Sequence, residues 1–136
     1  MDLQGGCFCG AVRYEVKGEI FNSTLCHCTD CRRISGAPAL AWFSARRADF
    51  RFTTGEPGRF SSSEQVLRGF CSHCGTTLTF EDGRWPEELD IATCSLDDPD
   101  AVPPGDHTFV RSRLHWVKLA DGLPEYPTTR TAGQGG

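Results

Sequence analysis

Apolar and polar positions alternate over short stretches along most of the chain, which is the pattern of β-strands with one buried face. These stretches are rich in β-branched and aromatic residues, and turn signals such as Thr54-Gly55-Glu56-Pro57-Gly58 separate them. We expect strands within residues 11–16, 39–44, 50–54, 65–70, 76–80, 89–94 and 107–112. Many short strands with turns between them predict a mainly β fold of antiparallel sheets.

Helices are expected to be short, because no segment keeps a 3.6-residue apolar period for three turns. The best helix start is at "SLDDPD", where Asp98 is a candidate cap and Pro99 would take the first helical position. Residues 1–127 read as a single domain, since no linker divides them. Residues 128–136 contain almost nothing to bury and are predicted to be a mobile C-terminal tail.

Composition and charge narrow the class of protein. The chain has 136 residues, enough for one core, and its 15 glycines and 8 prolines agree with many turns. The formal net charge of −4 opposes a nucleic-acid partner, which would need a basic surface. The start "MDLQGG" has no basic signal region, and no apolar run approaches the roughly 20 residues of a membrane span. We therefore expect a soluble, cytoplasmic protein with no membrane partner.

Eight cysteines are the main candidates for chemistry. In a reducing compartment they favour metal ligation or catalysis over a disulfide framework, which is the alternative. Cys7-Phe8-Cys9-Gly10 and Cys71-Ser72-His73-Cys74-Gly75 each place a glycine after the second cysteine, as zinc knuckles do. Together Cys7, Cys9, Cys71 and Cys74 would complete a tetrahedral structural zinc site; a redox role for the pairs is less consistent with a chain lacking a βαβ unit.

A second constellation, "CHCTDC", places Cys26, Cys28 and Cys31 within six positions. Three neighbouring thiolates occupy three corners of a tetrahedron and leave the fourth for water or substrate, as in catalytic zinc sites. The alternative is closure by a fourth protein ligand, for which Cys94, His107 and His115 are candidates. His27 and His73 stand between ligands and are expected not to bind the metal, although His27 is a candidate proton carrier.

The sequence resembles the glutathione-dependent formaldehyde-activating enzyme family, which includes the centromere protein V domain. The resemblance runs through "GGCFCGAVRYEV", "CHCTDCRRISGAP", "FCSHCGTTL", "SLDDP" and "HTFVRSRLHWVKLADGLPEY". It implies a β-tent zinc fold with two zinc ions per chain, one structural and one catalytic, on the same seven cysteines. It also implies a carbon–sulfur lyase that combines glutathione, or a similar thiol, with formaldehyde or another small aldehyde into an S-hydroxymethyl adduct.

Other residues are candidates for contacts with such substrates. Arg32 and Arg33 suit carboxylates, although surface ion pairs would explain them equally well. Trp42, with Phe43, Trp85 and Trp116, would line a pocket or belong to the core. Asp97 and Asp98 are expected to be turn and capping residues, and proton transfer is their alternative role. The alternative function is a non-catalytic, zinc-stapled protein that binds or carries glutathione. We expect a monomer or a homodimer.

Overall fold

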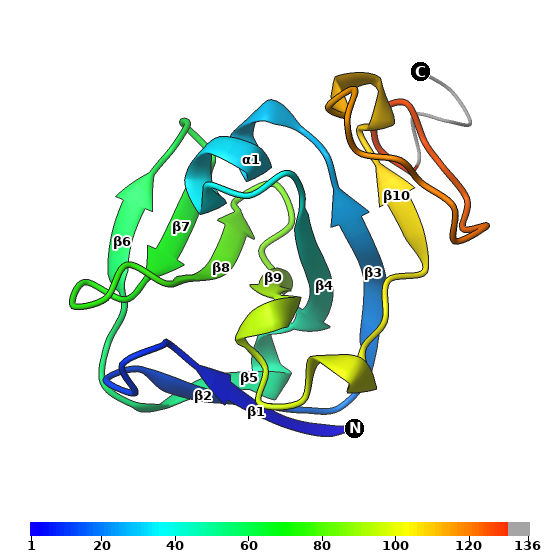
Figure 1. Cartoon of the computed structure of the whole chain (residues 1–136). Coiled ribbons are helices and arrows are strands. Elements are labelled where there is room, and N and C mark those ends of the chain that lie inside the picture. The colour runs from blue at the N-terminus through cyan, green and yellow to red at the C-terminus, as the bar shows by residue number, and fades with distance from the viewer. Residues whose placement is uncertain (131–136) are drawn as a thin grey trace.

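The structure, a computed structural model, describes residues 1–130 and contains two β-sheets (Figure 1). The smaller sheet has the strand order β1-β2-β5, and the larger has the order β10-β3-β4-β9-β8-β7-β6. The strands are β1 (Asp2–Gly6), β2 (Arg13–Lys17), β3 (Ile20–Cys26), β4 (Leu40–Arg46), β5 (Phe50–Thr54), β6 (Gly58–Ser61), β7 (Val66–Phe70), β8 (Thr77–Asp82), β9 (Glu88–Ala92) and β10 (Asp106–Thr108).

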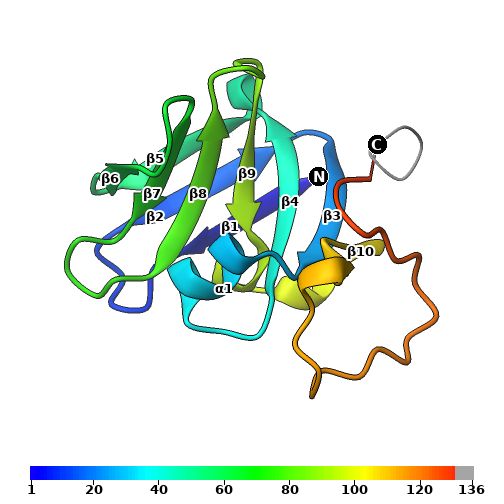
Figure 2. The ribbon, with the colours of Figure 1, turned by 90° about the horizontal axis from the view of Figure 1, so that it is seen from above.

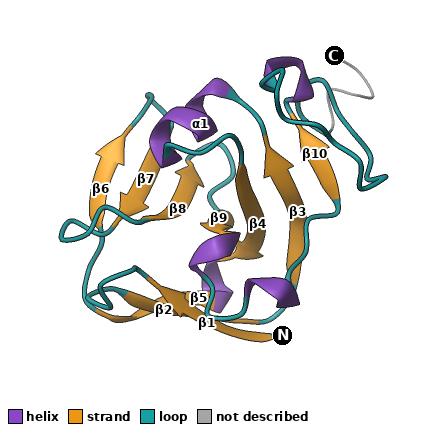
Figure 3. Cartoon of the chain, in the orientation of Figure 1, coloured by secondary structure: helices purple, strands orange, loops and turns teal. Residues whose placement is uncertain are grey.

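The strands pair antiparallel except at one edge, where β10 runs parallel to β3. Figure 3 shows that the helical elements are short; all but the last lie between strands, and the last follows β10. They are α1 (Thr29–Ser35), η1 (Arg47–Asp49), η2 (Thr93–Ser95), η3 (Pro99–Ala101) and η4 (Val110–Ser112). The prediction of a mainly β fold with short helical turns is therefore confirmed.

Each of the seven stretches predicted from alternation contains a strand, and the last one ends in the helical turn η4. Three strands escaped prediction because their sequences lack a clean alternation. β1 ends in two glycines, β6 is a four-residue edge strand, and β3 is irregular between Phe21 and Thr24, with Asn22 at a φ of 53°. Residues 29–35, which include Cys31 and were not predicted as a helix, form α1.

Asp98 and Pro99 do begin a helical turn, with the proline at its start. The side chain of Asp98 makes no capping hydrogen bond there, so the predicted capping role is wrong. A proline at the first helical position needs no donor of its own, since its missing N–H would be unpaired in any case. The turn is instead closed by backbone bonds from Ala101 and Val102.

The main core lies between the two sheets. Tyr14 and Val16 of β2 face Phe43, Leu78 and Ile91 of the larger sheet, and all five are almost completely buried. Successive residues of a strand point to opposite faces, so Trp42, next to Phe43, lies on the other face of the larger sheet. There it packs with Cys26, Cys31 and Ala92 in a second buried cluster. Both faces of β4 are therefore covered, which explains its nearly continuous apolar run.

The helix α1 covers this second cluster, at the end of the larger sheet opposite the smaller sheet (Figure 1). The chain after β10 returns along that strand, where Tyr126 donates a backbone hydrogen bond to His107 and His107 donates one to Pro124. Figure 2 shows this segment as a wide loop beside β3 and β10. None of the helices described is long and apolar enough to cross a bilayer.

The predicted tail, 128–136, lies mostly outside the described residues, which end at 130. In its described part, Thr128 accepts a hydrogen bond from the backbone of Phe109. The guanidinium of Arg130 pairs with the buried carboxylate of Asp106 through two bonds of 2.5 and 2.9 Å.

We expect Leu78→Ala to destabilise the protein by about 2–5 kcal/mol, because Leu78 has no exposed surface and its truncation leaves a cavity between the sheets. The free energy of unfolding is measured by urea denaturation under reducing conditions. Phe60→Ala is the matched control: Phe60 is 56% exposed on β6, and its loss is expected to change stability by about 0.5 kcal/mol or less. Equal losses in the two variants would contradict the assignment of the core.

Candidate metal centres and the adjoining cavities

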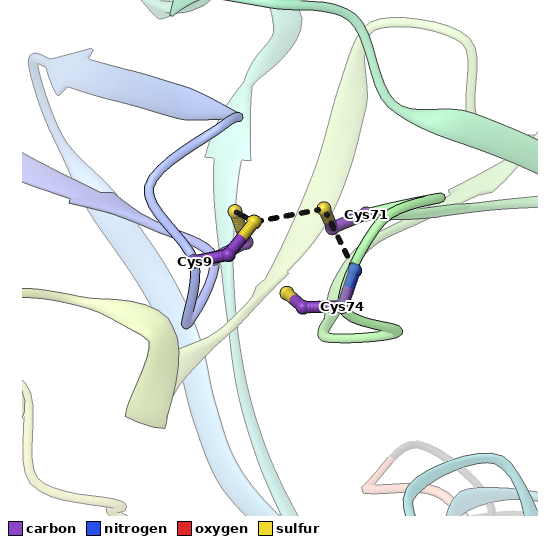
Figure 4. A group of neighbouring side chains, drawn as sticks. Cys9, Cys71 and Cys74 are labelled. Atoms are coloured by element: carbon purple, nitrogen blue, oxygen red, sulfur yellow. Dashed lines mark hydrogen bonds between the residues drawn. The ribbon is translucent and has the colours of Figure 1, made fainter.

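Two tight turns from different sheets bring four sulfurs together. Cys7 and Cys9 lie in the turn between β1 and β2, and Cys71 and Cys74 lie in the turn between β7 and β8. Figure 4 shows Cys9 facing Cys71 and Cys74 across the space between these turns. The four Sγ atoms all lie within 4.8 Å of one another.

The spacing of these sulfurs fits a tetrahedral metal ion. A Zn–S distance of about 2.3 Å implies sulfur–sulfur edges of about 3.8 Å. The Sγ atoms of Cys7 and Cys9 are 3.7 Å apart, as are those of Cys9 and Cys71. Gly10 and Gly75, the glycines that follow each pair, have φ values of 82° and 83°, in the left-handed region that glycine adopts at little cost. The knuckle geometry expected from the two motifs is therefore present.

Backbone amides and a hydroxyl group stabilise charge on these sulfurs. Val12 donates its N–H to the sulfur of Cys7 at 3.2 Å, and Cys74 donates its own to the sulfur of Cys71 at 3.4 Å. The hydroxyl of Thr76, 3.2 Å from the sulfur of Cys74, lowers the pKa of that thiol to about 5. Thr76 also accepts the N–H of Phe8, so it joins the two turns directly. Thiolates are the form that binds metal.

The second group is Cys26, Cys28 and Cys31, whose Sγ atoms also lie within 4.8 Å of one another. Cys26 ends β3, Cys28 precedes α1 and Cys31 lies in its first turn. The sulfur of Cys28 accepts the backbone N–H of Cys31 at 3.2 Å, as a capping side chain does. Cys26 and Cys31 are buried, whereas Cys28 is partly exposed. The cluster is thus open to solvent at Cys28.

Neighbouring thiols prepare Cys28 as the first thiolate of this cluster. A hydrogen bond from the thiol of Cys26, followed by one from Cys31, holds the pKa of Cys28 well below its ordinary value. On the buried side, the indole N–H of Trp42 points at the sulfur of Cys31, 3.4 Å away. Trp42 is only 6% exposed, so it contacts the cluster from within the protein. The sequence suggested Trp42 as a substrate contact and gave no sign of this contact with sulfur.

Among the described residues, no fourth side chain joins the three-cysteine group. Cys94 is exposed in η2, and His115 is exposed in the loop after η4. Both imidazole nitrogens of His107 are engaged elsewhere. His73 lies outside the four-sulfur group as well. The three sulfurs therefore form an incomplete tetrahedron of protein ligands.

A buried chain of polar groups, which the sequence did not reveal, starts beside this cluster. His27 has no exposed surface, and its Nε2 lies 3.0 Å from Nδ1 of His107. Nε2 of His107 lies 2.8 Å from the carboxylate of Asp121. Since a carboxylate can only accept, a neutral His107 donates to Asp121 and accepts from His27. Burial lowers the pKa of His27, which agrees with a neutral imidazole.

Two cavities flank α1. The larger has a volume of about 470 Å³ and is lined by Thr29, Arg32, Arg33, Gly36, Ala37, Pro38, Leu114 and Trp116. Thr29 directly follows Cys28 in the sequence, whereas none of the three cysteines is among the lining residues. The smaller, of about 210 Å³, is lined by Asp30, Arg33, Ile34, Ser62 and Arg68. Arg33 faces both cavities.

The other residues considered from the sequence are placed as follows. Phe43 belongs to the main core and Trp85 is 63% exposed, whereas Trp116 lines the larger cavity. Asp97 forms a bidentate ion pair with Arg13, at 2.6 and 2.9 Å, which lowers the pKa of its carboxyl group. Asp97 therefore ties the segment after η2 to the start of β2, and it lies outside both cavities.

Comparison with known proteins identifies the family. The family model described as "Glutathione-dependent formaldehyde-activating enzyme" matches residues 2–112. The chain belongs to this family. Both cysteine groups lie inside the residues matched by the glutathione-dependent formaldehyde-activating enzyme family.

Individual relatives agree with this assignment. A Halomonas elongata protein named "Putative glutathione-dependent formaldehyde-activating enzyme" is 30% identical over 128 residues, covering 88% of this chain and 82% of that protein. A Schizosaccharomyces pombe protein named an uncharacterized lyase is 33% identical over 79 residues, 58% of this chain and 57% of its own length. A crystal structure of a Rhodobacter sphaeroides protein superimposes with a TM-score of 0.57 at 25% identity, over 90% of this chain and 98% of that one. The family and these names support an enzyme of lyase type.

We expect Cys71→Ser to lose one of two bound metal equivalents, because it removes a ligand of the four-sulfur group. The measurement is metal analysis of purified, reduced protein, together with Co²⁺ substitution and its thiolate absorption. Cys94→Ser is the control, since Cys94 belongs to neither group, and it should keep both equivalents. Loss of metal in the Cys94 variant would show that this thiol is a ligand.

Proposed function

We propose that this protein is a zinc-dependent carbon–sulfur lyase that joins glutathione, or a similar thiol, to formaldehyde or another small aldehyde. The observation that carries the proposal is the three-cysteine group of Cys26, Cys28 and Cys31, which no fourth described side chain completes. Thr29, which directly follows Cys28, lines a cavity that also contains two arginines. The four-cysteine group would hold the structural zinc, and the three-cysteine group the catalytic one.

The donor set supports zinc at both groups. Thiolates are soft ligands, and tetrahedral all-sulfur sites are typical of zinc in proteins. Cys26, Cys28 and Cys31 would hold a zinc ion with three thiolates, and that ion would supply a binding position for a substrate thiol and would lower its pKa. The residues of the chain hold that site in place: the amide of Cys31 bonds to the sulfur of Cys28, and Trp42 contacts that of Cys31.

The reaction is an addition without any change in oxidation state. The sulfur of the thiol forms a bond to the carbonyl carbon, and the C=O π bond breaks. The proton that the thiol loses ends on the former carbonyl oxygen, which gives an S-hydroxymethyl product when the aldehyde is formaldehyde. The reverse reaction breaks the C–S bond, which is the lyase direction.

The larger cavity suits an anionic thiol such as glutathione. Two guanidinium groups, those of Arg32 and Arg33, line it, and no carboxylate does. Nη2 of Arg32 bonds to Thr29 at 3.4 Å, while its buried Nε has no partner among the described residues. Guanidinium groups bind carboxylates through paired, charge-assisted hydrogen bonds. The cavity would thus hold the thiol compound by its carboxylates, beside the cluster.

The catalytic requirement on the protein is modest. Thiols add to formaldehyde unaided, so binding the two reactants together in a productive orientation is sufficient for acceleration. The lining of the larger cavity contains no imidazole or carboxylate that would act as a base. Ionisation of the thiol is therefore assigned to its binding at the three-cysteine site.

Cys28→Ser tests this proposal, because Cys28 is the exposed ligand of the three-cysteine group. We expect the variant to lose the zinc of that group and to form the adduct only at the uncatalysed rate. Adduct formation from glutathione and formaldehyde is followed by NMR, with zinc content measured on the same samples. Cys94→Ser should retain both zinc and rate.

The same experiment separates the enzyme from a carrier. Two zinc ions, glutathione binding and no rate above background in the unmodified protein would contradict the lyase and indicate a protein that binds or carries glutathione.

Arg32→Gln and Arg33→Gln are each expected to weaken glutathione binding about tenfold or more, because a charge-assisted hydrogen bond contributes about 1.5–3 kcal/mol. The change should appear in the KM for glutathione, with little change in the KM for the aldehyde. Arg46→Gln is the control, since Arg46 is an exposed arginine at the end of β4 and outside both cavities. An unchanged KM in both cavity variants would remove these arginines from the site.

A further inference from the structure

Arg68, in the middle of β7, is a buried arginine without a carboxylate partner. It is only 7% exposed, and none of the ion pairs among the described residues includes it. Its Nη1 atom is buried and has no hydrogen-bond partner within the part of the chain described. Arginine is rarely buried unless it is paired, because removing its charge from water is costly.

The guanidinium of Arg68 is nevertheless held in a fixed position. Its Nε donates to the hydroxyl of Ser62 at 2.9 Å, and its Cζ lies 5.0 Å from the centre of the Phe80 ring, in a cation–π contact. These contacts orient the group and leave Nη1 unpaired. A side chain oriented in this way is suited to receive an anion without further ordering.

Arg68 is one of the residues that line the smaller cavity, of about 210 Å³. Arg68 and Ser62 line it from the larger sheet and the turn before β7, and α1 contributes Asp30, Arg33 and Ile34. Two guanidinium groups face one carboxylate, so the lining carries a net positive charge. The volume suits a group of a few atoms, such as a carboxylate.

Aromatic contacts connect this cavity to the three-cysteine group. The Phe80 ring lies 6.0 Å from that of Trp42, whose indole N–H contacts the sulfur of Cys31. The helix α1 provides a second connection, since it contains Cys31 and also Arg33, which lines both cavities. The smaller cavity is therefore linked to the larger one through Arg33, and to the three-cysteine group through Phe80 and Trp42.

We propose that the cavity between Arg68, Ser62 and α1 is a carboxylate-binding subsite that selects substrates bearing an acid group at a fixed distance from the reacting atom. This inference deepens the proposed function and rests on it, because the acid belongs either to the thiol or to the aldehyde that react at the three-cysteine group. The competing explanation is that Arg68 only packs against Phe80, and the experiment is designed to separate the two.

The test compares matched ligands on the zinc-loaded protein, with binding measured by calorimetry at constant ionic strength. One pair is glutathione and its diethyl ester, which differ in the thiol's carboxylates. The other is glyoxylate and glycolaldehyde, which differ in the aldehyde's carboxylate. Arg68→Met should weaken the acid member of one pair about tenfold or more and change the neutral member less than about twofold. Arg59→Met, on the neighbouring strand and 46% exposed, should change neither.

The pair that responds identifies the substrate that carries the acid. Equal effects on the acid and neutral members of both pairs, or no effect on either, would overturn the subsite and leave Arg68 with a packing role. Arg68→Lys keeps the charge but not the paired donors, so it should show the same selective loss to a smaller degree.

A measurement on the unmodified protein covers the case in which the Arg68 variants lose their zinc or fail to fold. The Nε–H resonance of Arg68 should shift with glutathione or glyoxylate but not with the matching neutral ligand. No difference within either pair would contradict the subsite. Because both measurements follow binding, selective binding without turnover would contradict the lyase proposal and leave the subsite standing.

Discussion

The meeting of two cysteine-bearing turns is the contact on which the rest of the structure depends. One turn belongs to the three-stranded sheet and the other to the seven-stranded sheet, and the sulfurs of Cys9 and Cys71 bridge 62 positions of sequence. A metal held there would close that long loop and hold the two sheets against each other on either side of the core. The second cysteine group, by contrast, is carried by β3 of the larger sheet and by α1, and involves no residue of the smaller sheet.

Local patterns were sufficient to predict much of this arrangement. Alternation located the regular strands, and the glycines after the second cysteine of each knuckle anticipated the left-handed turns at Gly10 and Gly75. Spacing divided the seven cysteines into a group of four and a group of three. In the structure the members of each group lie close to one another. These features depend on neighbours within a few residues, which a sequence displays directly.

Contacts between distant segments were beyond such patterns. His27 and His107 are 80 positions apart, and nothing near either residue indicates their pairing. The irregular strand β3 and the edge strand β6 are strands because of their partners, since their own sequences do not alternate cleanly. Arg68 lies within the stretch 65–70 that was predicted to contain a strand, but only the fold shows that it is buried without an acidic partner.

The sulfur of Cys28 belongs to two structures at once. It accepts the amide at the start of α1, and it is the most exposed member of the three-sulfur group. Electron density that it gave to an ion would be less available to the amide, so a stronger bond to the ion would weaken the hydrogen bond that begins α1. Ligation at the cluster and the start of α1 thus draw on the same lone pairs, in the helix whose Arg33 lines both cavities.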